Sequence, residues 1–443
     1  MLKTFTLGGV HPPENKLSAG KGIEPAPLPE TVIIPVAQHI GAPAKVLVKK
    51  GDEVKTGQLI AESAGFVSAN IHSSVSGKVL KVDKFPDTSG YRRMSVQIKT
   101  DGDEWIDEIN RSPEIIKDFS LSGEEIRNKI LASGLVGLGG ATFPSHVKLS
   151  VPEGKKAEYL IVNAVECERY LTADHALMLD KGEEIMVGIR LMMKALGVEK
   201  AIIGIENNKQ DAIDYMSGLC ENEKNINVQA LKVKYPQGGE KQLVAALLKR
   251  EVPSGGLPID VGVVAFNVGS IYAAYEAVQK NKPLIERVVT VTGKSIKNPS
   301  NFLVRIGTPV QTIIDAAGGL PEDTGKVVNG GPMMGKALKT LDVPVVKGSS
   351  GILVIPDNEA HRKEVITCIR CTKCVQACPS GLEPYLLQAM AEREMWEGCE
   401  KDRIMDCIEC GSCSYICPSN RPLLDYIRVG KANVGALMRA RKN

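Results

Sequence analysis

Residues 368–378 read CIRCTKCVQAC and residues 407–417 read CIECGSCSYIC, and a proline follows each stretch, Pro379 and Pro418. Both stretches have the pattern C-x-x-C-x-x-C-x-x-x-C-P, so one cysteine motif occurs twice. Three cysteines spaced in this way on a tight loop can reach three corners of one cube, while the fourth leaves on the following helix. The two motifs predict a helical, cysteine-rich domain over residues 356–443.

The repeated motif has the bacterial ferredoxin spacing for a pair of [4Fe-4S] clusters, in which the fourth cysteine of each run binds the cluster of the other run. Zinc is the alternative, because paired C-x-x-C motifs also bind zinc, but such sites take their ligands as two pairs. Triplets with a trailing Cys-Pro favour two clusters over zinc. The predicted ligand sets cross, with Cys368, Cys371, Cys374 and Cys417 at one cluster and Cys407, Cys410, Cys413 and Cys378 at the other.

Composition limits what the rest of the chain does. Its 443 residues suffice for several domains, and 55 basic against 52 acidic residues, a formal net charge of +3, give no case for nucleic acid as a partner. No secretory signal is apparent, and the most apolar long window, residues 261–278, is interrupted by polar side chains. We expect a soluble, cytoplasmic protein without a membrane span, whose cysteines serve metal ligation or redox chemistry. The cysteines outside the motif, Cys167, Cys220 and Cys399, are expected to be small buried apolar residues.

A pattern of short apolar alternations separated by glycines predicts a β barrel-sandwich over residues 31–100, after an arm of residues 1–30. The elements GDEVKTGQ (51–58) and SSVSGKV (73–79) resemble the two halves of biotinyl and lipoyl carrier domains. Such carriers hold a lysine at the tip of a hairpin, where this chain has Phe66. The carrier function is therefore expected to be lost, which leaves a docking module or inert packing as the role of the barrel.

Residues 120–285 alternate between strand and helix patterns, as in EYLIVNAVE (158–166), EEIMVGIRLMMKALG (183–197) and KAIIGIEN (200–207), with Gly197 as the expected helix C-cap. This repetition predicts a Rossmann-like α/β domain, a parallel sheet covered by helices with ligands at the carboxyl ends of its strands. Residues 286–340 have the pattern of a small α+β unit, rich in strands and with one helix.

A glycine-rich stretch, GLVGLGGATFPSHVK (134–148), lies near the start of the α/β region. It is not a P-loop, because no Lys-Ser or Lys-Thr closes it, and Thr142 occupies the third glycine position of a dinucleotide fingerprint. The pattern alone predicts a tight loop. Its backbone N–H groups could approach a phosphate or a planar ring, and Lys148 would add a positive charge.

The glycine loop is similar to the flavin- and NADH-binding loop of the flavoprotein subunit of respiratory complex I. Three further stretches resemble that family in the same order: NAVECE (163–168), GGEKQLV (238–244) and FNVGSI (266–271). The resemblance implies an FMN and NAD(H) site with Glu166, Glu168 and Phe143 as candidate catalytic residues. Phe143 would stack on the nicotinamide and Glu168 would lie beside the bound NADH. The implied cofactor-binding residues are Gly137, Gly139, Gly140, Lys148, Asn163, Glu166, Glu240 and Asn267.

Three positions depart from that family's pattern, since Val165 stands for an aspartate, Phe266 for an asparagine and Gly269 for a glutamate. The resemblance is therefore weakest for the residues that would contact the flavin ring. Without it, each acid of these stretches would be interpreted as a solvated loop carboxylate.

The order of the segments along the whole chain resembles the C subunits of Rnf complexes, which are ion-pumping ferredoxin:NAD oxidoreductases of the membrane. The resemblance implies a multidomain α/β protein with a β-grasp-like domain over residues 286–340. It implies hydride exchange with NAD(H) at FMN and single-electron transfer through two [4Fe-4S] clusters. It also implies a peripheral position on the cytoplasmic face of the cell membrane, beside other subunits that include a ferredoxin-like iron-sulfur protein. The alternatives are a soluble NADH-dependent reductase, such as a cobalamin reductase, and an electron-relay subunit without flavin.

Overall fold

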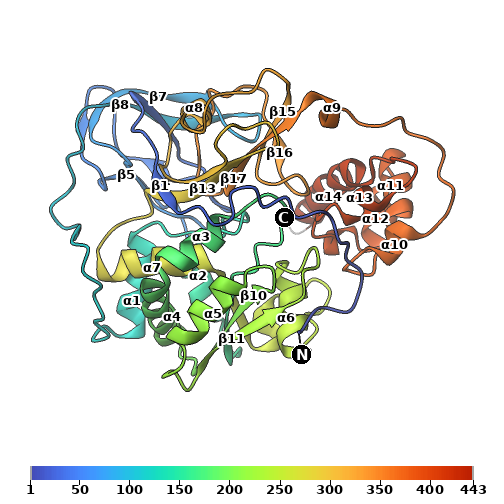
Figure 1. The fold of residues 1–443 in the computed structure, drawn as a ribbon, viewed down its shortest axis with the longest axis horizontal. Helices are drawn as coiled ribbons and strands as arrows, with labels where there is room; N and C mark the ends of the chain where they lie inside the picture. The colour runs from blue at the N-terminus through green and yellow to red at the C-terminus, as the bar shows by residue number, and fades with distance from the viewer. Residues whose placement is uncertain (1, 442–443) are drawn as a thin grey trace.

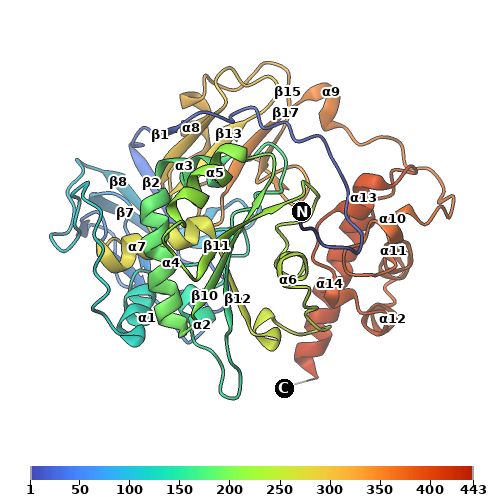
Figure 2. The same cartoon turned by 60° about the horizontal axis from the view of Figure 1, so that its bottom comes forward.

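The protein is a mixed α/β chain, and the computed structural model describes residues 2–441. Figure 1 shows the amino-terminal barrel (blue) next to a mixed sheet (gold to orange), with the α/β domain (green) below them and the cysteine-rich helices (red) at one side. Figure 2 shows the amino-terminal arm (dark blue) passing from the cysteine-rich helices to the mixed sheet. Among the described residues, no helix has both the length and the apolar character that a membrane crossing requires.

The barrel-sandwich consists of two small antiparallel sheets. Val32, Ile34, Ile60, Val96 and Ile98 are fully buried, and their side chains fill the space between the sheets. One sheet has the order β2-β8-β7-β4, with β2 Thr31–Pro35, β4 Glu53–Val54, β7 Gly77–Pro86 and β8 Arg92–Thr100. The other has the order β3-β5-β6, with β3 Lys45–Val46, β5 Leu59–Glu62 and β6 Ile71–His72. Phe66 lies in the connection between β5 and β6, at the predicted tip.

The α/β domain has the parallel sheet that the sequence predicts, in the order β11-β10-β9-β12. Its strands are β9 Tyr159–Asn163, β10 Lys200–Glu206, β11 Ile226–Leu231 and β12 Val263–Asn267. Its helices are α1 Gly123–Ala132, α2 Ser145–Leu149, α3 Ala173–Asp180, α4 Gly182–Leu196, α5 Gln210–Leu219, α6 Glu240–Leu248 and α7 Val268–Gln279, with a 3-10 turn η1 Pro258–Val261. Gly197 ends α4 in the left-handed conformation, at φ 69°, as its C-cap position predicts.

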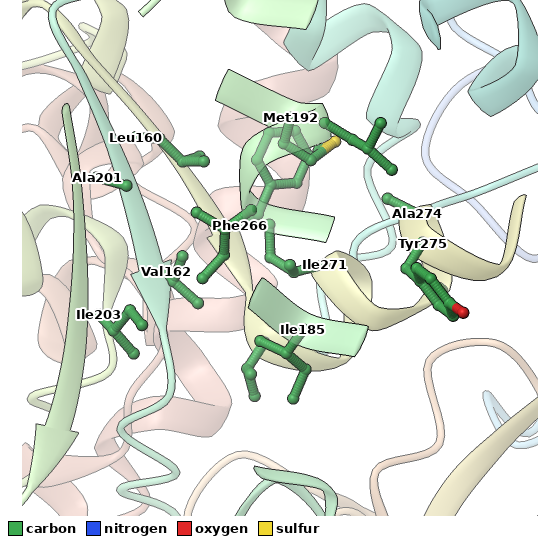
Figure 3. Close-up of a cluster of buried hydrophobic side chains, with 14 of the residues drawn as sticks. Leu160, Val162, Ile185, Met192, Ala201, Ile203, Phe266, Ile271, Ala274 and Tyr275 are labelled. Atoms are coloured by element: carbon green, nitrogen blue, oxygen red, sulfur yellow. The ribbon is translucent and has the colours of Figure 1, made fainter. Parts of the chain in front are cut away.

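Each face of this sheet is buried against different helices. Leu160 and Val162 of β9 point toward α4 and α7, which Figure 3 shows as a packed cluster with Phe266 and Ile271. Ile161 points the opposite way, into a second cluster with residues of α6 and Phe5 of the arm. The sheet is therefore covered on both sides, so that its exposed functional groups lie at the strand ends.

The β-grasp-like domain is built around a six-stranded mixed sheet in the order β1-β14-β13-β17-β15-β16. Its elements are β13 Glu286–Thr292, β14 Ser300–Arg305, α8 Val310–Ala316, β15 Thr324–Asn329, β16 Lys336–Ala337 and β17 Gly351–Pro356. Two of the strands lie outside residues 286–340: β17, and β1 Ile23–Pro25 of the arm, which pairs in parallel with β14. The fully buried run at Gly351–Val354 explains the central position of β17.

The cysteine-rich domain is helical, as expected. It contains α10 Lys373–Gln376, α11 Pro384–Glu392, α12 Trp396–Lys401, η2 Ile404–Asp406, α13 Ser412–Ile416 and α14 Leu423–Ala440, and α9 Asp357–Ala360 precedes it. The long helix α14 packs against α11 and α12 through a core that includes Leu387, Ile404 and Ile427. Cys220 and Cys399 are buried apolar residues, as predicted, whereas Cys167 is only partly buried.

Candidate functional site

Two asparagines lie side by side at the carboxyl edge of the parallel sheet, because Asn163 and Asn267 are register partners at the ends of β9 and β12. Asn163 donates from Nδ2 to the carbonyl of Gly238 at 2.8 Å. Asn267 caps α7 by accepting from the amide of Gly269 at 2.9 Å, and it donates to Asp174 Oδ2 at 2.7 Å. The sheet thus places two candidate residues where ligands of such folds bind.

The glycine loop passes directly over Asn267. Its ends are closed by a hydrogen bond from the amide of Gly137 to the carbonyl of Phe143 at 2.9 Å, and the Leu138 amide donates to Ser270 Oγ at 2.8 Å. Gly140 is exposed at φ 102°, and a Cβ at this position would meet no atom within 4 Å. A planar or phosphorylated ligand could therefore approach the backbone of this loop without displacing a side chain, which fits the flavin-binding expectation.

Lys148, on α2, lies below the loop and is engaged with the end of the sheet. Its Nζ contacts Glu240 Oε1 at 2.5 Å and the carbonyl oxygen of Ala265 at 2.6 Å. It also lies 5.3 Å from the centre of the Phe266 ring. Both partners of the ion pair are partly exposed, so the ammonium group remains accessible to an anionic ligand.

The carboxylate of Glu166 binds the amino terminus of α3. Its two oxygens accept from the amides of Asp174 at 2.8 Å and His175 at 3.2 Å, and the residue itself has φ 48°. Burial and then the nearby Glu166 charge raise the pKa of Asp174 to about 7. In the structure Glu166 therefore orders α3, and Asp174 links it to Asn267.

Glu168, which the resemblance places beside NADH, contacts the β-grasp-like domain. Its Oε1 accepts from the amide of Met333 at 2.7 Å, in the loop of residues 330–335 that the β-grasp-like domain contributes. Burial raises the pKa of Glu168 to about 7, and the side chain lies beside Tyr235. The Tyr235 hydroxyl donates to the carbonyl oxygen of Cys410 at 2.7 Å. Glu168 therefore joins the α/β domain to the β-grasp-like domain, beside the tyrosine that reaches the cysteine-rich domain.

The barrel tip contacts the segment that follows the glycine loop. His146 Nε2 on α2 lies 3.0 Å from the carbonyl oxygen of Phe66, and the two rings are 6.2 Å apart in an edge-on arrangement. The amide of Ile40, also in the barrel, donates to the carbonyl of Thr142 at 3.3 Å. Phe66 remains 66% exposed, and Phe143 is half-buried. The barrel is thus docked on the candidate site within the same chain.

The cysteines of the second motif form one group with Cys378 of the first. Cys378, Cys407, Cys410 and Cys413 line a common cavity. Cys374 in turn lies beside Cys417, while Cys368 and Cys371 are exposed in the segment before α10. Four thiols around one cavity fit a cubane cluster, and the grouping is the one that crossed ligation requires.

The three departures from the complex I pattern have structural explanations. Val165 and Phe266 are buried on opposite sides of the sheet, Val165 against α6 and Phe266 against α4 and α7. Gly269 lies so close to Asn267 that a Cβ would be 3.0 Å from Asn267 Oδ1. An acidic side chain at this position would displace the asparagine, so any ring contact here differs from that of the family.

Sequence reasoning missed several residues that shape this region. Lys16 of the arm donates from Nζ to the carbonyls of Glu166, Glu168 and Leu171 at 2.8, 2.9 and 2.6 Å. Tyr235 joins two domains, and Asp174 joins Asn267 to Glu166. None of these residues belongs to a recognisable motif, so only their neighbours in space reveal a role.

Four protein-family models match the chain in sequence order. The RnfC barrel sandwich hybrid domain matches residues 4–103, the Nuo51 FMN-binding domain residues 130–276, the SLBB domain residues 288–337 and the 4Fe-4S dicluster domain residues 360–418. The matches agree with the four units of the fold and with the two kinds of cofactor that the site geometry fits.

Curated relatives resemble the chain over nearly its full length. It is 47% identical to the C subunit of the Na(+)-translocating ferredoxin:NAD(+) oxidoreductase complex of Acetobacterium woodii, over 98% of this chain and 97% of that one. It is 48% identical to the C subunit of the proton-translocating ferredoxin:NAD(+) oxidoreductase complex of Clostridium ljungdahlii, over 98% and 94%. The C subunit of the ion-translocating oxidoreductase complex of Rhodobacter capsulatus is 42% identical, over 98% and 84%.

A solved structure shares the fold at much lower identity. The NAD+-reducing [NiFe]-hydrogenase in its H2-reduced state aligns with a TM-score of 0.51 and 17% identity, covering 71% of this chain and 63% of that one. At this identity the likeness concerns the fold alone.

Proposed function

Because the chain belongs to the family of C subunits of ion-translocating ferredoxin:NAD(+) oxidoreductase complexes, we propose that it exchanges hydride with NAD(H) and passes the electrons singly to the rest of such a complex. It is an electron-transfer subunit of an oxidoreductase, with FMN and two [4Fe-4S] clusters as its cofactors. When bound, FMN converts between hydride and single electrons, and each cluster carries one electron at a time.

In this proposal the protein binds the flavin at the carboxyl edge of the sheet. The open backbone at Gly140 accepts the planar or phosphorylated group, Gly139 keeps the loop close to Asn267, and Lys148 supplies a positive charge nearby. Asn163 and Asn267 direct their amides to the same edge. Glu166 and Asp174 act indirectly on the flavin site. Glu166 fixes the start of α3, and Asp174 fixes the Asn267 side chain.

The observation that carries the proposal is the direct contact between the α/β domain, which contains the candidate flavin site, and the cysteine-rich domain. Tyr235 lies in the α/β domain beside Glu168, and its hydroxyl donates to the carbonyl of the cluster ligand Cys410 at 2.7 Å. The crossed ligand set that contains Cys410 therefore faces the flavin domain. We infer that this cluster exchanges electrons with the flavin and that the set containing Cys368 and Cys371 lies farther along the relay.

The outer end of the relay suits a protein partner. Residues 361–373 are exposed throughout and combine apolar Val365, Ile366 and Ile369 with five basic or imidazole side chains and one acid, Glu364. An acidic iron-sulfur subunit of the assembly would complement this surface around Cys368 and Cys371. Through such a contact the other subunits would hold this chain in a peripheral position, which we propose to be on the cytoplasmic face of the membrane.

Two glycines provide a test of the flavin site. Gly140→Val adds bulk on the exposed loop at φ 102°, and Gly154→Val is the matched control, since Gly154 is also exposed, has φ 77° and has no atom within 4 Å of a Cβ. The wild-type protein and the control, reconstituted without oxygen, should show flavin absorbance that NADH bleaches, and Gly140→Val should lose both flavin and NADH:ferricyanide activity. If the wild-type protein instead binds iron but contains no flavin and shows no bleaching with NADH, the chain is an electron relay without flavin.

A further inference from the structure

The amino-terminal strap, which we define as residues 3–25, touches three of the four structural units. Near its start Lys3 pairs with Leu231 at the edge of the parallel sheet, and the Lys232 amide donates to the Lys3 carbonyl at 2.9 Å. At its end β1 becomes an edge strand of the six-stranded sheet. Between these points the strap passes the cysteine-rich domain, as Figures 1 and 2 both show.

The strap contacts the very segment that carries a cluster ligand. The amide of Gly9 donates to the carbonyl of Ala377 at 2.9 Å. Gly8 has φ 68°, and a Cβ at this position would overlap the carbonyl group of Cys378. The backbone of the strap therefore lies against that of residues 377–378 with no space for a side chain.

The next residue of the strap binds the tyrosine that reaches the same cluster site from the α/β domain. Val10 and Tyr235 exchange two backbone hydrogen bonds, at 2.8 and 2.9 Å. Tyr235 then donates its hydroxyl to Cys410. Val10 and Tyr235 are buried in one apolar group with Met333, Ala377 and Cys410. Since Cys378 and Cys410 belong to one ligand set, the strap and Tyr235 hold that set from two sides.

We propose that residues 8–10 are positioning residues for electron transfer, because they hold the Cys378-containing cluster at a fixed distance from the flavin site. This inference rests on the proposed function. Lys16 extends the same strap to the carbonyls of Glu166, Glu168 and Leu171, so the strap joins the cluster side and the flavin side through continuous chain. The rate of electron transfer between two sites depends on their separation, and a strap without a side chain at Gly8 keeps that separation short.

Gly8→Ala tests this role, and Gly20→Ala is its matched control. Both glycines lie in the strap with positive φ, 68° and 76°, but a Cβ at Gly20 meets nothing within 4 Å. In stopped-flow mixing with NADH, Gly8→Ala should bleach its flavin at the wild-type rate and reduce its clusters more slowly than the Gly20→Ala control, because the overlap at Gly8 displaces the segment of Cys378. Hydrogen exchange should rise across residues 373–382 in Gly8→Ala alone.

Val10→Ala is the alternative test variant if Gly8→Ala does not fold, because this substitution removes atoms from the buried contact and adds none. It should increase exchange in the same residues and slow cluster reduction in the same direction. The inference would be overturned if a folded variant, Gly8→Ala or Val10→Ala, showed the same hydrogen exchange and the same rate of cluster reduction as the Gly20→Ala control. Absence of NADH bleaching in the wild type would overturn the proposed function instead, while the exchange comparison would still decide whether the strap holds the cysteine segment.

Discussion

Substitution of Lys148 by Met separates a ligand-binding role from a structural one, because the two roles predict effects of different size. The ion pair with Glu240 is partly exposed, with side-chain exposures of 30% and 38%, so its loss should cost the fold no more than about 1 kcal/mol. A charge-assisted hydrogen bond to a bound phosphate is worth roughly 1.5–3 kcal/mol. We therefore expect Lys148→Met to weaken the affinity for FMN or NADH by about 10- to 100-fold, while Tm falls only slightly through loss of the ion pair and of the bond to the Ala265 carbonyl oxygen.

The matched control is Lys155→Met, which removes another partly exposed ion pair of the same domain, from Lys155 Nζ to Asp260 Oδ1 at 2.9 Å. If Lys148 serves an anionic group of the ligand, this control should keep the affinity that Lys148→Met loses. The assays are fluorescence titration of FMN and steady-state NADH:ferricyanide kinetics, each with thermal unfolding as a control. An unchanged Kd for FMN and KM for NADH in Lys148→Met, together with a lowered Tm, would refute the reasoning and leave the lysine with a purely structural role.

Three further predictions concern other parts of the chain. Cys378→Ser should perturb the electron paramagnetic resonance signal of the cluster bound by Cys407, Cys410 and Cys413, and Cys417→Ser that of the other cluster; the reverse assignment would contradict crossed ligation. Burial lowers the pKa of His72 to about 3, so the unfolded chain takes up a proton below pH 6.5 while the folded protein does not, and stability falls as pH decreases. Between pH 7 and pH 5.5 the wild type should lose about 1.2 kcal/mol more than His72→Gln in urea unfolding, and the exposed His361→Gln should behave like the wild type. Intact-mass measurement should find no biotin or lipoate on the barrel, because Phe66 cannot form the required amide; added mass on residues 60–70 would disprove this.

Local patterns predicted much of this fold and led to the family. The alternation of strand and helix patterns in residues 158–207 predicts the parallel sheet. The position of Gly197 after an apolar helical run predicts the C-cap that the structure has. The cysteine spacing led to a helical domain in which Cys378 lies with the second motif. Patterns of this kind depend on neighbours in the sequence, where periodicity and spacing carry the information.

The remaining features depend on neighbours in space. Nothing in the first 30 residues indicates that Gly8 contacts Cys378, that Lys16 binds three carbonyls or that residues 23–25 complete a distant sheet. The contacts of the acidic candidate residues could not be predicted from the sequence either. Glu166 was predicted from resemblance as a flavin contact, and its flavin role stays a prediction; in the structure its carboxylate caps α3, an interaction set by the left-handed turn at that residue.

Polar contacts at its predicted ligand segments join the cysteine-rich domain to the rest of the protein, beside the buried apolar group around Val10 and Tyr235. Besides the Tyr235 contact to Cys410, Gln242 donates to the carbonyl of Pro379 at 3.2 Å, Gly255 donates to Asp406 at 3.2 Å, and Arg428 donates to the carbonyl of Met334 at 3.3 Å. Three of these four contacts end on or next to predicted cluster ligands, since Pro379 follows Cys378 and Asp406 precedes Cys407. A bound cubane would fix the separation of the four ligand sulfurs and thereby the geometry of these segments. We therefore expect loss of the cluster to loosen domain docking at the same segments, and under the proposed function the docked arrangement is the one in which this cluster exchanges electrons with the flavin.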